Sequence, residues 1–159
     1  MNFRDIDKDF NWIRYRAQQD RGVTYAFVAE KPIPRLRGKS DILYIGKTDN
    51  SIQTRYRQET ETNNTPRNTQ MTNIRLTHVF RQLRRMGIEA TCYFTKGQTV
   101  NPPLSFRCSE AFSKMLKTWD KRSYIDSNTF DFTSPSIEKY LLVTYAEEHL
   151  ELPPLNNRF

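Results

Sequence analysis

Hydrophobic residues along this chain fall into stretches of strand-like composition and stretches of helical spacing. β-Branched and aromatic residues crowd the strand-like stretches, which are bounded by charged or turn-forming residues. We therefore predict three strands, at about residues 23–29, 42–46 and 88–94. Apolar residues three or four positions apart predict helices at about residues 4–19, 72–86 and 109–121, and from residue 134 onward.

Polar or basic segments separate these elements, at about residues 30–41, 60–72 and 95–134. The first contains Pro32, Pro34 and several basic residues, so we expect an irregular loop there and not a tight hairpin turn. A chain of 159 residues has room for one domain with such insertions. We predict a single α/β (α+β) domain over residues 1–159, with a small, mainly antiparallel three-stranded sheet flanked by helices.

The chain is basic, with 25 Lys and Arg against 18 Asp and Glu and a formal net charge of +7. This charge favours a polyanionic partner such as nucleic acid, although a basic protein without such a partner has the same composition. Cys92 and Cys108 form no Cys-x-x-Cys pair, which argues against a zinc site or a disulfide framework. No apolar run is long enough to cross a bilayer, so we expect a cytoplasmic protein without membrane contact.

Residues 42–57 combine a strand end, a glycine and the start of a helix. The apolar strand ends at Gly46, where the backbone can turn sharply or approach a ligand closely. Turn and cap residues then open a helix whose free N–H groups point toward the same place, and Arg55 follows in its first two turns. Because guanidinium and free backbone N–H groups both bind anions, this unit is suited to hold a phosphate.

Tyr44-Ile45-Gly46, with Ile52 and Arg55 on the helix that follows, resembles the YIG half of the GIY-YIG nuclease superfamily. The earlier strand contains Val23-Thr24-Tyr25, which resembles the GIY half of the motif. It has Val and Thr where the family has Gly and Ile, but it keeps the tyrosine. The resemblance implies that the two tyrosines meet at one site.

The last predicted helix begins at Ser134-Pro135, a typical helix start, and carries Glu138 in its first turns. Taken alone, a carboxylate there is explained by the helix dipole. The helix is followed by a proline-containing tail with Asn156, and this order is similar to the family's last helix with its metal-binding glutamate. The resemblance implies that Glu138 binds a divalent cation, Mg²⁺ or Mn²⁺. One carboxylate is enough, since Mg²⁺ keeps several waters and takes phosphate oxygens as further ligands.

The resemblance also gives the other site residues roles in phosphodiester hydrolysis. Tyr25 is the candidate proton acceptor, and Tyr44 would hold the attacking water or the scissile phosphate. Arg55 would contact the non-bridging oxygens, where negative charge builds up in the transition state. Lys47 beside the strand end, together with Arg55, would favour the phenolate form of Tyr25. Asn156 would orient the site.

The position one turn after the family's arginine departs from the usual pattern. Some members carry His or Tyr there, whereas this chain has Glu59. Either proton transfer depends on Tyr25 alone, or His78 on the next predicted helix supplies a substitute. We favour the first interpretation.

Basic residues outside the motif are candidates for contacts with DNA phosphates. They come from the 30–41 segment, the arginine helix, the end of the 72–86 helix and the 95–134 segment. They are Arg35, Arg37, Lys39, Arg57, Arg84, Arg85, Lys114 and Lys117. The polar segment at about 60–72 is a further place where base edges could be read.

These features predict a metal-dependent endonuclease that hydrolyses phosphodiester bonds in double-stranded DNA. No appended zinc finger or coiled coil is visible, so recognition would reside in the insertions. That arrangement resembles the compact restriction endonucleases of the superfamily, and it predicts a site-specific enzyme and a possible homodimer. A structure- or damage-selective repair nuclease is the nearest alternative. A non-catalytic nucleic-acid-binding module is the alternative from another class.

Overall fold

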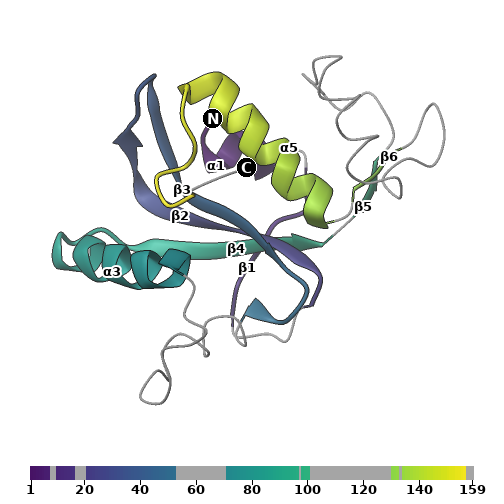
Figure 1. Ribbon diagram of the computed structural model, residues 1–159, viewed down its shortest axis with the longest axis horizontal. Helices are drawn as coiled ribbons and strands as arrows, with labels where there is room; N and C mark the ends of the chain where they lie inside the picture. The colour runs from purple at the N-terminus through teal and green to yellow at the C-terminus, as the bar shows by residue number, and fades with distance from the viewer. Residues whose placement is uncertain are drawn as a thin grey trace.

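The structure is a computed structural model that describes residues 1–7, 10–16, 21–52, 71–96, 98–100, 130–132 and 134–156. Its centre is a four-stranded antiparallel sheet with the strand order β1-β4-β2-β3 (Figure 1). The strands are β1 (Ile13–Arg14), β2 (Val23–Pro34), β3 (Lys39–Thr48) and β4 (Ala90–Lys96). The predicted mainly antiparallel sheet is confirmed, and it has one strand more than the three expected.

Helices cover both faces of this sheet (Figure 1). The short helix α1 (Phe3–Asp7) and the long helix α5 (Ser134–His149) lie on one face, and α3 (Met71–Arg85) lies on the other. The helices expected at 72–86 and from residue 134 are therefore confirmed. α3 ends at Arg85, two residues before the expected stop at Gly87, whose φ of 69° is in the left-handed region that favours glycine. None of the helices in the described ranges is long and apolar enough to span a membrane.

The segment at 30–41 is part of a long hairpin, so the prediction of an irregular loop there is wrong. β2 and β3 pair from Val23 with Thr48 to Pro34 with Lys39, and Arg35 N–H donates to the Gly38 carbonyl at 3.0 Å to close a tight turn. The prolines are tolerated because β4 pairs with β2 only as far as Ala29. Glu30 N–H still donates to the Glu89 carbonyl at 2.9 Å, but beyond Glu30 this edge of β2 has no strand to pair with, and the register with β3 is also broken between Val28 and Ile33.

The predicted helix at 4–19 is also wrong beyond its first turns. α1 ends at Asp7, and Ile13–Arg14 instead pairs with β4 as an edge strand. Tyr15 N–H extends this pairing by donating to the Cys92 carbonyl at 2.9 Å. The free edge of β4 offers these backbone partners, and a helical segment could not use them. The tertiary pairing therefore overrides the local helical spacing.

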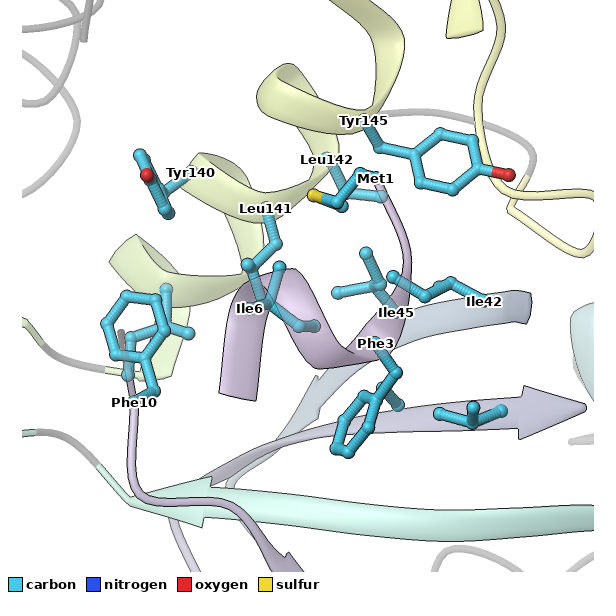
Figure 2. Packing of buried hydrophobic residues seen from close by; sticks show 13 residues of the cluster. Met1, Phe3, Ile6, Phe10, Ile42, Ile45, Tyr140, Leu141, Leu142 and Tyr145 are labelled. Carbon is cyan, nitrogen blue, oxygen red and sulfur yellow. The ribbon is translucent and has the colours of Figure 1, made fainter. Parts of the chain in front are cut away.

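Two hydrophobic clusters fill the space on either side of the sheet. The first joins α1, α5 and the sheet, and Figure 2 shows Ile6, Leu141 and Ile45 meeting there. The second joins α3 to the opposite face, where the rings of Phe27 and Phe80 lie 4.7 Å apart. We call these the α5 face and the α3 face of the sheet. Side chains alternate between the two faces along the strands, except at the register shift in β3, where the neighbours Leu43 and Tyr44 both lie on the α3 face.

Hydrogen bonds at both ends fix α5 along the hairpin. At its N-terminus, Thr24 Oγ1 donates to the Ser134 carbonyl at 2.7 Å, and Ser134 Oγ donates to the Gly22 carbonyl. Just past its C-terminus, Arg35 Nε and Nη2 reach the two carboxylate oxygens of Glu151 at 2.8 and 2.7 Å. α5 therefore starts at the beginning of β2 and ends beside the hairpin turn.

The pair of Arg35 and Glu151 predicts a specific pH dependence of stability. The Arg35 guanidinium, with a further hydrogen bond from Leu36 N–H at 2.7 Å, lowers the pKa of Glu151 below its ordinary value of 4.5. A lowered pKa stabilises the fold above the unfolded-state value, and this stabilisation is lost as pH falls through the folded-state pKa. We expect Glu151→Gln to cost about 1 kcal/mol of unfolding free energy at pH 7 and less at pH 3. Urea titrations at both pH values measure this; an equal cost at both would contradict the ion-pair explanation.

Candidate active site

Tyr25 and Tyr44 meet at one end of the sheet, where Tyr25 pairs with Gly46 across β2 and β3. Their ring centroids lie 5.8 Å apart, and the side chains are 0% and 6% exposed. A Cβ atom at Gly46 would lie 2.5 Å from Tyr44 Cε1 and 2.8 Å from Tyr44 Oη. The Tyr44 ring therefore occupies the space above Gly46, and only glycine leaves room for it. The structure thus brings together the two tyrosines of the predicted motif.

Lys47 and Glu138 lie at the same end of the sheet but on its other face. The tyrosine rings belong to the cluster on the α3 face. Lys47 pairs with Thr24, whose hydroxyl contacts the start of α5, so Lys47 points to the α5 face. Glu138 is half-buried, one turn beyond Ser134. The single pocket expected for these residues is therefore divided by the sheet, and a phosphate that meets all of them would lie across the sheet end.

Thr24 and Ser134 help to build the site, a role that was not predicted for them from the sequence, where Ser134 marks only a helix start and Thr24 is only part of the altered GIY motif. Both are buried, and their hydroxyl groups tie the start of β2 to the start of α5. One signal was available in the sequence: Thr24 stands where the GIY motif has an apolar residue. A buried hydroxyl requires a hydrogen-bond partner. For Thr24 that partner is the backbone carbonyl of Ser134, at the start of α5, the helix that carries Glu138.

Several predicted site residues lie outside the described residues, namely Arg55, Arg57, Glu59, Lys114 and Lys117. Ile52 is the last residue described before Arg55, and it is buried in the same cluster as the two tyrosines. Ile52 is the first member of the Ile-x-x-Arg unit, and it is the only member that the described ranges include. The role of Arg55 stays a prediction, as do those of the other four.

Asn156 holds the backbone of the Tyr-Ile-Gly segment. Its Nδ2 donates to the Ile45 carbonyl at 2.7 Å, and its Oδ1 accepts from Ile45 N–H at 3.0 Å. Leu155 N–H adds a bond to the Leu43 carbonyl at 3.1 Å, so the C-terminal tail pairs with the outer edge of β3. This geometry agrees with a residue that orients the site through the backbone beside Tyr44.

We expect Asn156→Ala to destabilise the protein by about 1–3 kcal/mol. The backbone N–H and carbonyl of Ile45 would both lose their partly buried hydrogen-bond partner. Asn156→Asp should cost a similar amount, since a carboxylate accepts from the N–H but cannot donate to the carbonyl. Chemical denaturation measures both costs. Unchanged stability in both variants would show that the tail does not hold β3 in solution.

The candidate DNA-contact residues of the hairpin turn lie far from the tyrosines, and not beside the proposed site. Pro34 lies nine positions after Tyr25 in β2, a span of about 30 Å in an extended strand. Arg37 and Lys39 are at that far end, and Arg35 is held by Glu151. Arg35 is better explained as part of the fold than as a DNA contact.

The remaining described candidates on α3 are at the surface. Arg84 and Arg85 are exposed in its last turn, just before the chain enters β4. His78 is also exposed on α3, and the structure leaves its proposed substitute role as a prediction. Burial raises the pKa of the Cys92 thiol to about 12, so this group stays protonated and is neither a nucleophile nor a metal ligand at neutral pH.

Glu138 is suited to hold a hard divalent cation by its chemistry. It supplies an oxygen ligand, and its half-buried position leaves part of the side chain open to solvent. Across the ranges that the structure describes, no three His, Cys, Asp or Glu side chains gather into a metal-binding group. A cation at Glu138 would therefore take its other ligands from water and phosphate oxygens, as Mg²⁺ commonly does.

Comparison with known proteins gives a match in structure only. No protein-family model matches the sequence, and no curated protein matches it either. The fold is similar to that of a mutant of bacteriophage T4 EndoII, with a TM-score of 0.51 and 14% sequence identity. The match covers 96% of this chain and 97% of the EndoII chain. EndoII is a GIY-YIG nuclease, so the predicted GIY-YIG-like fold is confirmed.

Proposed function

We propose that this chain, which shares the fold of the GIY-YIG nuclease EndoII, is a metal-dependent endonuclease that hydrolyses phosphodiester bonds in DNA. The observation that carries the proposal is the packing of Tyr44 over Gly46 and against Tyr25 at the end of the hairpin. Two strand tyrosines that served only as core packing would not need a glycine at this position. The close approach of the Tyr44 ring to the backbone explains why a glycine stands two residues after Tyr44, in a strand that continues to Thr48.

In the proposed mechanism the DNA backbone crosses the end of the sheet, where residues from both faces can contact one phosphate. A cation held by Glu138 would supply positive charge to the phosphate oxygens and to the leaving group. Tyr25 would accept the proton of the attacking water, and Tyr44 would position that water. Arg55 would bind the non-bridging oxygens, most strongly in the transition state.

We further propose that the enzyme is a site-specific, restriction-type nuclease whose recognition element is the insertion after β4. This insertion is connected to the sheet by a two-stranded ribbon, β5 (Gln98–Val100) and β6 (Phe130–Phe132). β5 starts two residues after β4, and β6 contacts α5 beside its N-terminus (Figure 1). The ends of the insertion are thus attached next to the proposed site. A homodimer would allow both DNA strands to be cut.

A supercoiled-plasmid nicking assay tests the proposed activity. We expect nicked or linear DNA with Mg²⁺ or Mn²⁺ and intact supercoiled DNA with EDTA. DNA binding without cleavage in either metal would instead support a non-catalytic binding module. Sequencing the cut ends then separates the two nuclease types: ends at one defined sequence indicate a restriction-type enzyme, whereas ends at lesions or branch points indicate a repair-type enzyme.

A further inference from the structure

The register of the sheet places lysines on both sides of the start of β2. Thr24 pairs with Lys47 on β3, and Val23 pairs with Lys96 on β4. Adjacent strands are about 4.8 Å apart, so the two lysine backbones are about 10 Å apart across the sheet end. Lys96 is exposed and was not among the residues singled out from the sequence.

The side chains of the two lysines point to opposite faces of the sheet. Lys47 points to the α5 face, with Glu138. Lys96 pairs with Val23, whose side chain is in the tyrosine cluster, so Lys96 points to the α3 face. Because Tyr25 pairs with Phe94, Lys96 is the diagonal neighbour of Tyr25, with about 7–8 Å between their backbones. It is thus a cation that shares a face with the tyrosines.

Arg21 adds a third positive charge, just before β2, the strand that lies between β3 with Lys47 and β4 with Lys96. It is exposed and lies two residues before β2. Gly22 follows with a φ of 65°, and its carbonyl accepts the hydrogen bond from Ser134 Oγ. This anchored turn fixes the backbone from which Arg21 projects. We call Arg21, Lys47 and Lys96 the sheet-end cations.

We propose that Lys96 and Arg21 bind backbone phosphates of the DNA strand that is cut, and hold it across the end of the sheet. This inference rests on the proposed function and adds two contact residues to it. DNA presents closely spaced phosphates along its backbone, so cations arranged in a row on neighbouring strands can neutralise several of them at once. These contacts would set the register of the strand over the tyrosines without reading its sequence.

Binding measured without cleavage tests the inference. A fluorescein-labelled DNA duplex is titrated with protein in EDTA, at several NaCl concentrations, and anisotropy is recorded. We expect Lys96→Met and Arg21→Met each to weaken binding about eightfold at about 0.1 M salt, and each to reduce the slope of log K against log salt by about 0.9. Lys31→Met is the matched control, since Lys31 is an exposed lysine in the part of β2 next to the hairpin turn, away from the tyrosines.

The outcomes separate this inference from the proposed function. If wild type binds DNA and both variants bind like Lys31→Met, the phosphate contacts are wrong, whereas the nuclease proposal is unaffected. If wild type neither binds nor cuts any DNA, the proposed function itself fails. Circular dichroism of each variant shows that the fold is kept, because these surface changes remove no buried group.

Discussion

Replacing Glu138 by glutamine is expected to slow DNA cleavage by at least about a hundredfold while DNA binding in EDTA stays within about twofold of wild type. Glutamine keeps the size of the side chain and one acceptor oxygen, but it replaces the other oxygen by an NH2 donor and removes the charge that attracts a divalent cation. The change should therefore act on the metal and not on α5, whose start is held by hydrogen bonds from the Thr24 and Ser134 hydroxyl groups to backbone carbonyls.

The matched control is Glu147→Gln, which makes the same chemical change on an exposed residue at the other end of α5. We expect it to cleave like wild type. Single-turnover rates on supercoiled plasmid at several Mg²⁺ concentrations compare the two variants. Equal rates for both would remove Glu138 from the site.

A methyl group at Gly46 is the second change with a large expected effect. In Gly46→Ala the new Cβ would lie 2.5 Å from Tyr44 Cε1, well inside contact distance, so the Tyr44 ring has to move. That ring is buried against Tyr25 and Phe27, which leaves little room for it. We expect a loss of about 1–3 kcal/mol in unfolding free energy, and a cleavage rate at least about tenfold lower in the molecules that remain folded.

Gly87→Ala provides the control for general destabilisation. Gly87 has a φ of 69° and open space around its Cβ position, so alanine there costs backbone strain without displacing any side chain. We expect about 1–2 kcal/mol of destabilisation and an unchanged cleavage rate at a temperature where both proteins are folded. Chemical denaturation and plasmid cleavage measure the two effects separately. Wild-type cleavage by Gly46→Ala would show that the placement of Tyr44 does not matter for the chemistry.

The long central strands show how far the sequence pattern extends. Residues 23–29 and 42–46 are rich in β-branched and aromatic residues because both faces of the sheet are covered there, and they were predicted correctly as strands. The outer half of the hairpin has solvent-exposed residues and two prolines, so it carries no such pattern. Its pairing comes from the register of the inner half and the turn at Gly38.

The edge strand β1 could not be predicted from local sequence. Ile6, Phe10 and Ile13 have helical spacing, yet only Ile6 and Phe10 are buried, whereas Ile13 is 52% exposed and pairs with Phe94. The edge of β4 that accepts this pairing is about 80 residues away in the chain. Sequence spacing therefore favoured a helix that tertiary pairing replaced.

The sequence motif predicted which tyrosines belong to the candidate site. It could not predict the contacts that depend on how the strands pair. Tyr25 and Tyr44 meet, as the motif implied, because the glycine opposite Tyr25 leaves space for the second ring. The division of the site between two faces follows from strand alternation and from the side on which α5 packs, which the motif does not specify. Lys96 was missed because its proximity to Tyr25 depends on how β4 pairs with β2.

The central claim is that Tyr25 on one face of the sheet and Glu138 on the other act on the same phosphate. The most direct measurement is the single-turnover cleavage rate of Tyr25→Phe, Glu138→Gln and the double variant on supercoiled plasmid with Mg²⁺. Residues that act in one step are not additive, so we expect each single change to slow cleavage at least about a hundredfold and the double variant to be hardly slower than the slower single one. Wild-type rates in both single variants would contradict the claim.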